Sequence, residues 1–242
     1  MRAMSTLARK KREFAQREEL ILETAQRLML KVGYLGVTMD LIAKEIEYSK
    51  GTIYQHFSSK EEILLALALQ FNRKQAEFFQ RAAMFSGKSR ERVIALAEAY
   101  ELFVRLYPDH FKTELLILNE SIRAKGSIEL RRQLEACEQQ SMSIVSGVVR
   151  DGLAQGDFEG VPGISPEEIV FGIWTGAFGA YVLMSSDAPL TALGIQDPMK
   201  ALRVSIHAVL DGFGWRPFSS EWDYQKTRER VKKEIFPKET IL

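Results

Sequence analysis

The sequence predicts an all-α protein, and three observations support that fold class. Apolar residues recur at helical spacing along most of the 242 residues. No run of β-branched residues alternates strictly with polar ones, as a half-buried strand would require. Glycine, proline and capping residues fall in the breaks between helical segments. With 46% hydrophobic and 27% charged residues, the chain can bury a core, as one large domain or as two smaller ones.

The N-terminal part predicts three helices. The first is a long amphipathic helix that carries apolar residues such as Ile21 and Leu28 on one side and stops at Gly33. Two short helices follow, and each begins directly after a residue whose side chain can cap it, Thr38 and then Ser49. The predicted ranges are residues 10–32, 39–46 and 50–56.

Longer helices are predicted for the rest of the chain. Pro166 suits the first turn of a helix, and Ser165 with Glu168 has the spacing of a capping box. The predicted ranges are residues 60–85, 89–106, 110–122, 127–154, 166–186, 197–213 and 219–235. We expect three regions, namely a small helical domain over residues 1–60, a larger helical bundle over residues 61–215, and a helical C-terminal extension over residues 216–242.

Charge is unevenly distributed along the chain. The formal net charge is +1, yet residues 1–60 contain 11 Lys and Arg against 7 Asp and Glu, whereas residues 61–242 contain 22 against 25. A basic N-terminal region joined to a slightly acidic remainder is typical of a protein whose N-terminal part meets a polyanion such as nucleic acid.

Patterns typical of enzymes and metal sites are weak. The segment AAMFSGKS at residues 82–89 fits a phosphate-binding loop only loosely, and a predicted helix precedes it where such a loop needs a strand. The three histidines show no metal-binding spacing, and no G-x-S-x-G motif occurs. We therefore expect no catalytic residues, no metal and no cofactor.

One uncharged segment, residues 169–186, approaches the length that spans a membrane. Three glycines and Thr175 make it less apolar and no basic residues flank it, so we expect a buried or partner-facing helix. The single cysteine, Cys137, excludes an intrachain disulfide, and the first twenty residues lack the apolar stretch of an export signal. These features favour a cytoplasmic protein with no membrane partner.

Residues 38–57 predict two short helices joined by a tight turn at Glu47 and Tyr48. With the helix before them, they form a helix-turn-helix. In the second short helix, Ile53 and Phe57 fall within about 40° of each other on a helical wheel and point inward. The outward face combines a residue without a side chain and three hydrogen-bonding residues, namely Gly51, Thr52, Tyr54 and Gln55.

The side chains of that outward face suit contact with DNA. Gln55 can hydrogen-bond an adenine edge, Thr52 can touch a thymine methyl group, and Tyr54 can donate to a phosphate. Lys50 and Lys60 bracket the helix as candidate phosphate ligands. A helical hairpin exposed only to solvent is the alternative, but the two capped helices and the basic N-terminal region favour DNA.

The segment TMDLIAKEIEYSKGTIYQHFSSKEEILL closely resembles the DNA-binding domain of the tetracycline-repressor (TetR) family, and ILETAQRLMLKVGYLGV resembles its first helix. The motif-specific resemblance covers residues 18–66. It implies phosphate contacts by Thr38 and Lys60 and a recognition element made of Lys50, Gly51, Thr52, Tyr54, Gln55 and His56. The family usually has glycine in the turn, where this chain has Glu47, so an altered turn is expected.

Farther along, VVRDGLAQGDFEG and the apolar helix after it resemble the family's seventh helix, turn and eighth helix. The resemblance implies a homodimer built from the last two core helices and a ligand cavity among the fourth to eighth helices. Small residues spaced by four and an apolar stripe on the next helix also favour such an interface, namely Gly172, Gly176, Ala180, Leu202, Ile206, Val209 and Leu210.

The ligand cavity is expected to be apolar. Bulky residues on helices that should surround it are Phe103, Tyr107, Phe111, Met142, Trp174, Phe178 and Tyr181. Few charges interrupt them, so we expect a small apolar or aromatic effector. Each of these residues can equally be ordinary core, and the sequence leaves that alternative open.

Together these features predict a homodimeric transcriptional repressor that binds a pseudo-palindromic operator in double-stranded DNA and is released by a small-molecule effector. Two alternatives stay open, namely an all-α enzyme acting in the cavity and a constitutive DNA-binding protein without effector. Turnover of a bound metabolite would identify the first alternative. Operator binding that no metabolite changes would identify the second.

Overall fold

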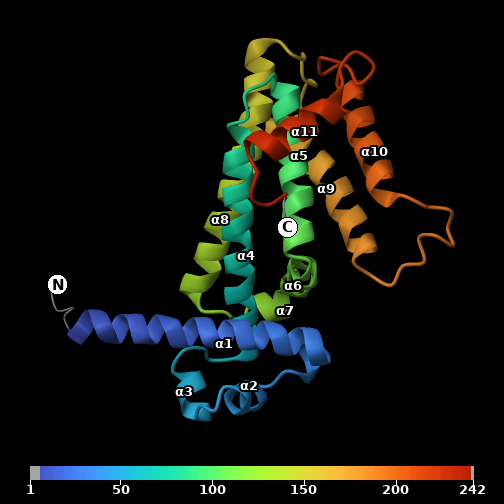
Figure 1. The fold of residues 1–242 in the computed structure, drawn as a ribbon. Helices are drawn as coiled ribbons and strands as arrows, with labels where there is room; N and C mark the ends of the chain where they lie inside the picture. The colour runs from blue at the N-terminus through green and yellow to red at the C-terminus, as the bar shows by residue number, and fades with distance from the viewer. Residues whose placement is uncertain (1–5, 241–242) are drawn as a thin grey trace. The chain divides into compact units, whose positions relative to one another are not determined.

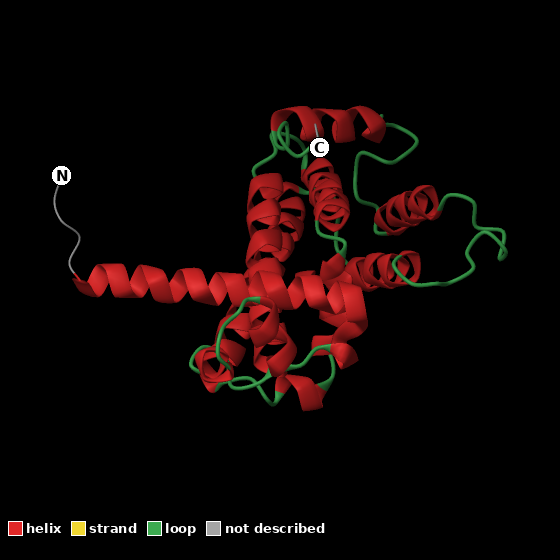
Figure 2. Ribbon diagram, turned by 60° about the horizontal axis from the view of Figure 1, so that its bottom comes forward, coloured by secondary structure: helices red, strands yellow, loops and turns green. Residues whose placement is uncertain are grey.

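The computed structural model describes residues 6–240 and confirms the predicted all-α fold, because this part of the chain consists of helices joined by loops and turns (Figures 1 and 2). In chain order the helices are α1 (Thr6–Gly36), α2 (Met39–Glu45), α3 (Lys50–Tyr54), α4 (Lys60–Ala83), α5 (Ser89–Leu106), α6 (Asp109–Ile117), α7 (Glu120–Arg123), α8 (Ile128–Gln155), α9 (Pro166–Met184), α10 (Pro198–Gly212) and α11 (Tyr224–Glu234). Residues 6–240 contain no strand.

Two compact units make up the chain. The first comprises the chain as far as Gln70 together with Thr113–Leu134. The second comprises Phe71–Lys112 together with the chain from Glu135 onward. Helices α4, α6 and α8 therefore each contribute residues to both units. The three-region division of the sequence stays a prediction.

The first unit packs α1, α2, α3 and the start of α4 around one apolar cluster. Ile21, Ile42, Ile53 and Ile63, one from each helix, are all fully buried in it. Full burial of an aliphatic side chain contributes about 1.5–3 kcal/mol. Four such residues therefore hold the short helices α2 and α3, which are too short to be stable alone.

Gly33 interrupts α1 near its end. Its φ of 72° is left-handed, a conformation that glycine adopts without steric cost. The stop expected at this residue is confirmed as a break, after which the chain makes one further turn that ends at Gly36.

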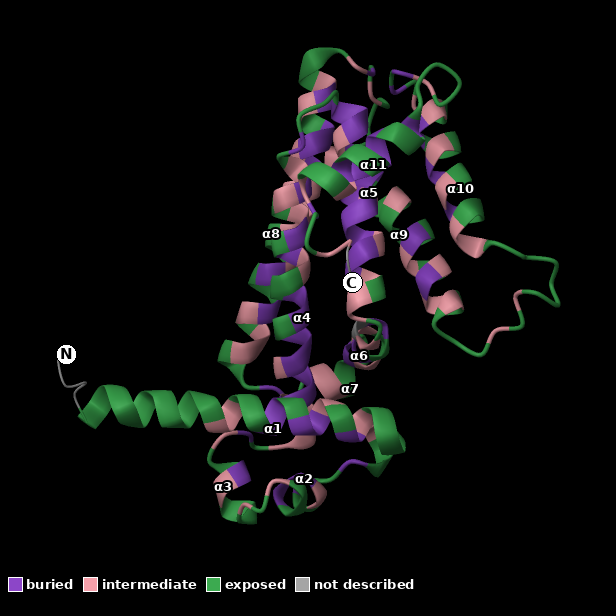
Figure 3. Ribbon diagram, viewed as in Figure 1, coloured by how far each residue is buried: buried purple, intermediate pink, exposed green. Residues whose placement is uncertain are grey.

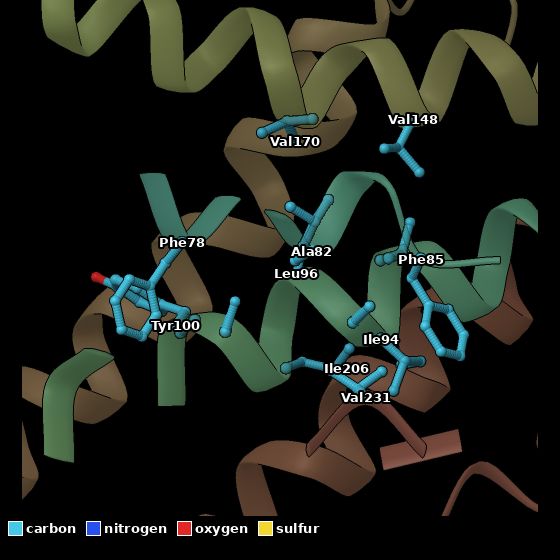
Figure 4. Packing of buried hydrophobic residues seen from close by; sticks show 14 of the residues in the cluster. Phe78, Ala82, Phe85, Ile94, Leu96, Tyr100, Val148, Val170, Ile206 and Val231 are labelled. Atoms are coloured by element: carbon cyan, nitrogen blue, oxygen red, sulfur yellow. The ribbon is translucent and has the colours of Figure 1, made fainter. Parts of the chain in front are cut away.

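The second unit is built around α5, most of whose residues are buried (Figure 3). Figure 4 shows Ile94 on α5 among side chains from the surrounding helices, including Val148 of α8, Val170 of α9, Ile206 of α10 and Val231 of α11. A central helix covered on several sides buries most of its residues, and in α5 these include the charged residues Arg90, Glu91 and Glu98 as well as apolar ones.

The helix expected over residues 110–122 is two helices. Asn119 ends the first and caps the second, because its Oδ1 accepts from the amide of Ser121 at 2.9 Å. Asparagine competes for backbone donors in this way and so favours caps over helix interiors.

Helix α9 begins with the predicted capping box. Ser165 Oγ accepts from the amide of Glu168 at 3.2 Å, and the Glu168 carboxylate accepts from the amide of Ser165 at 2.7 Å. Tyr181 is buried, whereas Gly172 and Gly176 are exposed, so α9 is covered on one side only. Within the described residues, no helix is long and apolar enough to cross a membrane.

The C-terminal extension forms α11, which packs on α5. The contact buries charged groups, since Arg228 Nη1 lies 2.8 Å from Glu98 Oε2 and both side chains are at most 5% exposed. Lys232 Nζ lies 3.1 Å from the other oxygen of Glu98, and the Thr227 hydroxyl donates to Glu91 at 3.0 Å. Buried charges need such partners, because an unpaired one costs several kcal/mol.

Candidate nucleic-acid interface

The turn between α2 and α3 keeps a left-handed residue although it lacks glycine. Glu47 has a φ of 57°. The Tyr48 amide donates to the carbonyl of Ala43 at 2.9 Å, and the Glu47 amide donates to that of Lys44 at 3.3 Å. These are the two bonds of a Schellman motif. The expectation of an altered turn was therefore wrong, because Glu47 adopts the left-handed backbone that glycine usually supplies there. The strain of this backbone costs roughly 1 kcal/mol.

Four of the predicted DNA-contacting residues lie together on the exposed side of α3, namely Lys50, Gly51, Tyr54 and Gln55. Ile53, on the other side, is fully buried and anchors α3 in the core of the first unit. A Cβ atom at Gly51 would meet no atom closer than 3.7 Å, so the backbone is open to approach there. The face offers an ammonium group, a phenol and a carboxamide, which hydrogen-bond phosphates and base edges.

Two threonine hydroxyls flank this face and also stabilise it. Thr38 is exposed and caps α2, since its Oγ1 accepts from the amide of Leu41 at 3.1 Å. Thr52 is half-buried, and its Oγ1 lies 2.8 Å from Oγ of Ser49, the cap of α3. A hydroxyl that accepts at a cap still has its proton to donate to an acceptor such as phosphate.

Lys50 is paired within the protein. Its Nζ lies 2.7 Å from Asp40 Oδ1, and both side chains are more than half exposed. The hydrogen bond to Asp40 raises the pKa of Lys50 above its usual value. An exposed pair of this kind contributes little to stability, so Lys50 can exchange the carboxylate for a phosphate at small cost.

His56 lies away from the exposed face of α3. Its side chain is only 1% exposed, and its ring stacks on Phe14 of α1 with the centroids 3.9 Å apart. Nδ1 lies 3.9 Å from a carboxylate oxygen of Glu18, and burial lowers the pKa of His56. The structure therefore gives His56 a contact between α1 and α3 in place of the outward position that the resemblance implied.

Lys60 also makes an internal contact. Its Nζ donates to the carbonyl oxygens of Tyr34 and Val37, each at 3.2 Å, and lies 4.4 Å from the centroid of the Tyr34 ring. Tyr34 belongs to the last turn of α1 and Val37 follows the helix directly, and a cation is favourable near such carbonyls at a helix C-terminus. The stop at Gly33 was the sequence signal that these carbonyls would need a partner.

Aromatic residues predicted to surround a ligand meet in the core of the second unit. Phe111 lies 5.5 Å from Tyr181 and 5.7 Å from Phe178 between ring centroids. Tyr100, which the sequence did not single out, joins them at 5.2 Å from Tyr181. Phe103 is fully buried. Offset and edge-to-face pairs at these distances are favourable, so the rings support one another directly.

The other three predicted ligand-binding residues differ in exposure. Tyr107 lies 5.0 Å from Phe103 between ring centroids and is half-buried. Met142 is half-buried against the same core. Trp174 is 43% exposed, and its ring centroid lies 5.6 Å from that of Phe178. Trp174 therefore stands at the surface of the aromatic cluster.

An open apolar groove of about 320 Å³ runs between α9 and α10. It gathers six of the seven residues predicted for a dimer interface, namely Gly172, Gly176, Ala180, Leu202, Ile206 and Val209. The seventh, Leu210, is fully buried and points into the core. An added Cβ at Gly172 or Gly176 would meet no atom within 4 Å, so this side of α9 is uncovered in the single chain.

Comparison with known proteins gives a match for the helix-turn-helix region. Residues 21–67 match the family described as "Bacterial regulatory proteins, tetR family". The "Fatty acid metabolism regulator protein" of Bacillus subtilis is 25% identical over 179 residues, which cover 72% of this chain and 87% of that protein. The "Uncharacterized HTH-type transcriptional regulator YhgD" of Bacillus subtilis is 25% identical over 58% of this chain and 71% of its own length.

The fold is also similar to solved structures. A transcriptional regulator of the TetR/AcrR family from Thermobifida fusca aligns with a TM-score of 0.60 at 22% identity, over 82% of this chain and 98% of its own. The alignment covers almost all of that regulator, so the likeness of fold extends beyond the helix-turn-helix.

Proposed function

We propose that this chain, whose residues 21–67 match the tetR family, is a DNA-binding transcriptional regulator that acts as a homodimeric repressor and is released from its operator by a small apolar molecule. The observation that carries the proposal is the exposed face of α3, where Gln55 and Tyr54 flank the open backbone of Gly51. Because we propose that the protein acts on DNA, we also propose that it is located in the cytoplasm.

Each residue of this face has a distinct proposed role. Gln55 reads an adenine edge, and Thr52 contacts a thymine methyl group or a neighbouring base. Lys50, Tyr54 and Thr38 contact phosphates and so fix the register of α3 in the major groove. His56 and Lys60 act indirectly, because their polar atoms face α1 and hold it in place.

The groove between α9 and α10 supports the proposed dimer. Its lining is apolar, and Gly172 and Gly176 leave room for a close helix–helix approach. A second copy related by a two-fold axis would cover the same groove with its own α9 and α10. Two α3 helices would then read half-sites about 34–36 Å apart, or a multiple of that distance.

The aromatic cluster of the second unit supports an apolar effector. Burial raises the pKa of Tyr181, so its phenol stays neutral beside the surrounding rings. A relative that is 25% identical is named a fatty acid metabolism regulator. We therefore propose fatty acids and their acyl thioesters as the first class to test. The chain acts by binding alone in this proposal and catalyses no reaction.

Operator titrations with and without a panel of fatty acids and acyl thioesters test the proposal. One compound should weaken operator binding by a factor of about 5–150, and operator DNA should weaken binding of that compound by the same factor. Calorimetry with and without operator measures the second quantity. Equal effector affinities in both titrations would contradict regulation through this site. Turnover of the compound would favour an enzyme, and a panel without effect would favour constitutive DNA binding.

A further inference from the structure

Helix α1 extends past α3 in the direction of the N-terminus (Figure 1), and this extension has no core of its own. Residues 6–16 are all exposed, and the first buried residue of α1 is Ile21 (Figure 3). An amphipathic helix is normally stabilised by burying one face. The first three turns of α1 therefore bury no face in the first unit, apart from the contact of Phe14 described next.

Phe14 orients this extension. Its ring stacks on His56, the residue directly after the exposed face of α3, so the side of α1 that carries Phe14 faces the helix-turn-helix. Taking about 100° per residue, Lys10 and Lys11 fall within about 60° of Phe14. Arg9 and Arg12 fall more than about 130° away, on the opposite side.

The row on the Phe14 side is positively charged. Within residues 6–240, Lys10 and Lys11 form no ion pair, whereas Arg9 on the other side pairs with Glu13 at 3.0 Å. Arg17 also falls within about 60° of Phe14, but Glu18, whose carboxylate lies 3.9 Å from His56 Nδ1, brings the opposite charge to the same side of the helix. Lys10 and Lys11, which form no ion pair within residues 6–240, thus lie on the α3-facing side of α1 where this helix extends beyond α3.

We propose that Lys10 and Lys11 bind the phosphates of DNA that flanks the half-site read by α3. The proposal rests on the proposed function, since the DNA held by α3 brings the flanking duplex to this row. Its support is charge complementarity, because duplex DNA carries a phosphate charge about every 1.7 Å of axis and a basic helix face can neutralise several of them. The contacts would add affinity and length to the footprint but no base preference.

The test compares two double variants of equal charge. Lys10→Gln with Lys11→Gln removes the proposed contacts, and Arg9→Gln with Arg12→Gln is the control on the opposite side of the same helix. Lysine, arginine and glutamine have similar helix propensities, so α1 should stay helical in both, which circular dichroism checks. Binding is titrated against salt on two duplexes, one ending at the outer half-site edges and one extended by about one helical turn on each side.

On the extended duplex we expect the lysine variant to lose affinity roughly tenfold or more at low salt. A plot of the logarithm of the binding constant against the logarithm of the salt concentration should become shallower, by about 0.9 for each phosphate that the variant no longer neutralises. On the short duplex its affinity should match that of the wild type, and the arginine variant should lose a little affinity, equally on both duplexes.

Equal losses of affinity for the two variants, or an equal loss for the lysine variant on both duplexes, would overturn the proposal. If the wild type binds no specific sequence, the proposed function fails and this inference with it. If it binds specifically but ignores duplex length, only this inference fails.

Discussion

The exposed face of α3 and the exposed face of α9 and α10 have opposite chemistry. The first carries Lys50, Tyr54 and Gln55, and the second is a groove lined mainly by alanine, leucine, isoleucine and glycine. The interiors of the two units differ in the opposite sense, because the buried charged side chains lie in the unit whose outer groove is apolar. Among the described residues, the buried arginines and glutamates all belong to the second unit, namely Arg90, Glu91, Glu98 and Arg228.

This difference separates what each surface can bind. Polar groups held on a small apolar core keep their hydration until a polar partner such as DNA replaces it. An apolar groove gains most from a second apolar surface, at about 25 cal/mol for each Å² buried. The charges in the core of the second unit are paired, with Arg90 Nη1 2.6 Å from Asp211 as a further example.

The largest expected effect is loss of the dimer in Gly176→Glu. The added side chain has room in a single chain, since no atom lies within 4 Å of its Cβ position, so the protomer should fold. In a dimer its carboxylate would be buried without a partner, at a cost of several kcal/mol. Sedimentation should show monomers with greatly reduced operator affinity. Gly147→Glu on α8 is the control, because its Cβ position is equally open, and a dimeric Gly176→Glu protein would exclude α9 from the interface.

Removing a buried charge partner should have the next largest effect. Arg228→Ala leaves Glu98 with Lys232 alone, and we expect the free energy of unfolding to fall by about 3 kcal/mol. Urea denaturation measures the change. Arg228→Met combined with Glu98→Leu should recover most of the loss, because an apolar pair of similar volume needs no counter-charge. A double variant less stable than Arg228→Ala would show that the ion pair adds net stability beyond offsetting the cost of burying its two charges.

Acid should weaken the second unit through His207. Burial, and then the charges of Arg228 and Arg90, lower the pKa of His207 from 6.5 to about 4. The folded protein therefore disfavours the proton that the unfolded chain accepts, so stability is complete above pH 6.5 and declines as the pH falls toward about 4. Thermal unfolding at several pH values checks this, and His207→Gln should flatten the decline in that window. An equally steep decline in the variant would assign it to other groups.

The smallest expected effect is a gain in stability in Glu47→Gly. Glycine adopts the left-handed backbone of this turn without strain, so the free energy of unfolding should rise by about 0.5–1 kcal/mol. Glu47→Gln keeps the strained backbone and removes only the charge, so it should leave stability nearly unchanged. If glutamine stabilises as much as glycine, the cost at this position is electrostatic.

Local signals in the sequence predicted much of the fold. The capping residues are each three residues from the amide that they accept from, so the local sequence is enough to predict them; they are Thr38, Ser49 and Ser165. The period of the apolar residues likewise gave the long helices. The split at Asn119 was missed because asparagine is tolerated within a helix when no cap forms.

Contacts between distant residues limited the prediction of the sites. His56 turns toward Phe14, and Lys60 reaches the carbonyls at the end of α1, because of partners more than twenty residues away. Tyr100 joins the aromatic cluster only once α5 and α9 are side by side. The pairing of Glu98 with Arg228 spans 130 residues, and no periodicity in the sequence indicates such a contact.

The central claim is that apolar faces on α9 and α10 join two copies so that two polar α3 faces read one operator. In vitro selection of bound DNA, with the protein-to-duplex ratio measured on the selected sequences, tests it most directly. We predict a pseudo-palindrome with half-sites about 34–36 Å apart, or a multiple of that distance, and two protomers on each duplex. Gln55→Ala should relax the preference at particular base positions and leave the others intact. Asymmetric sites bound by a single protomer at full affinity would contradict the claim.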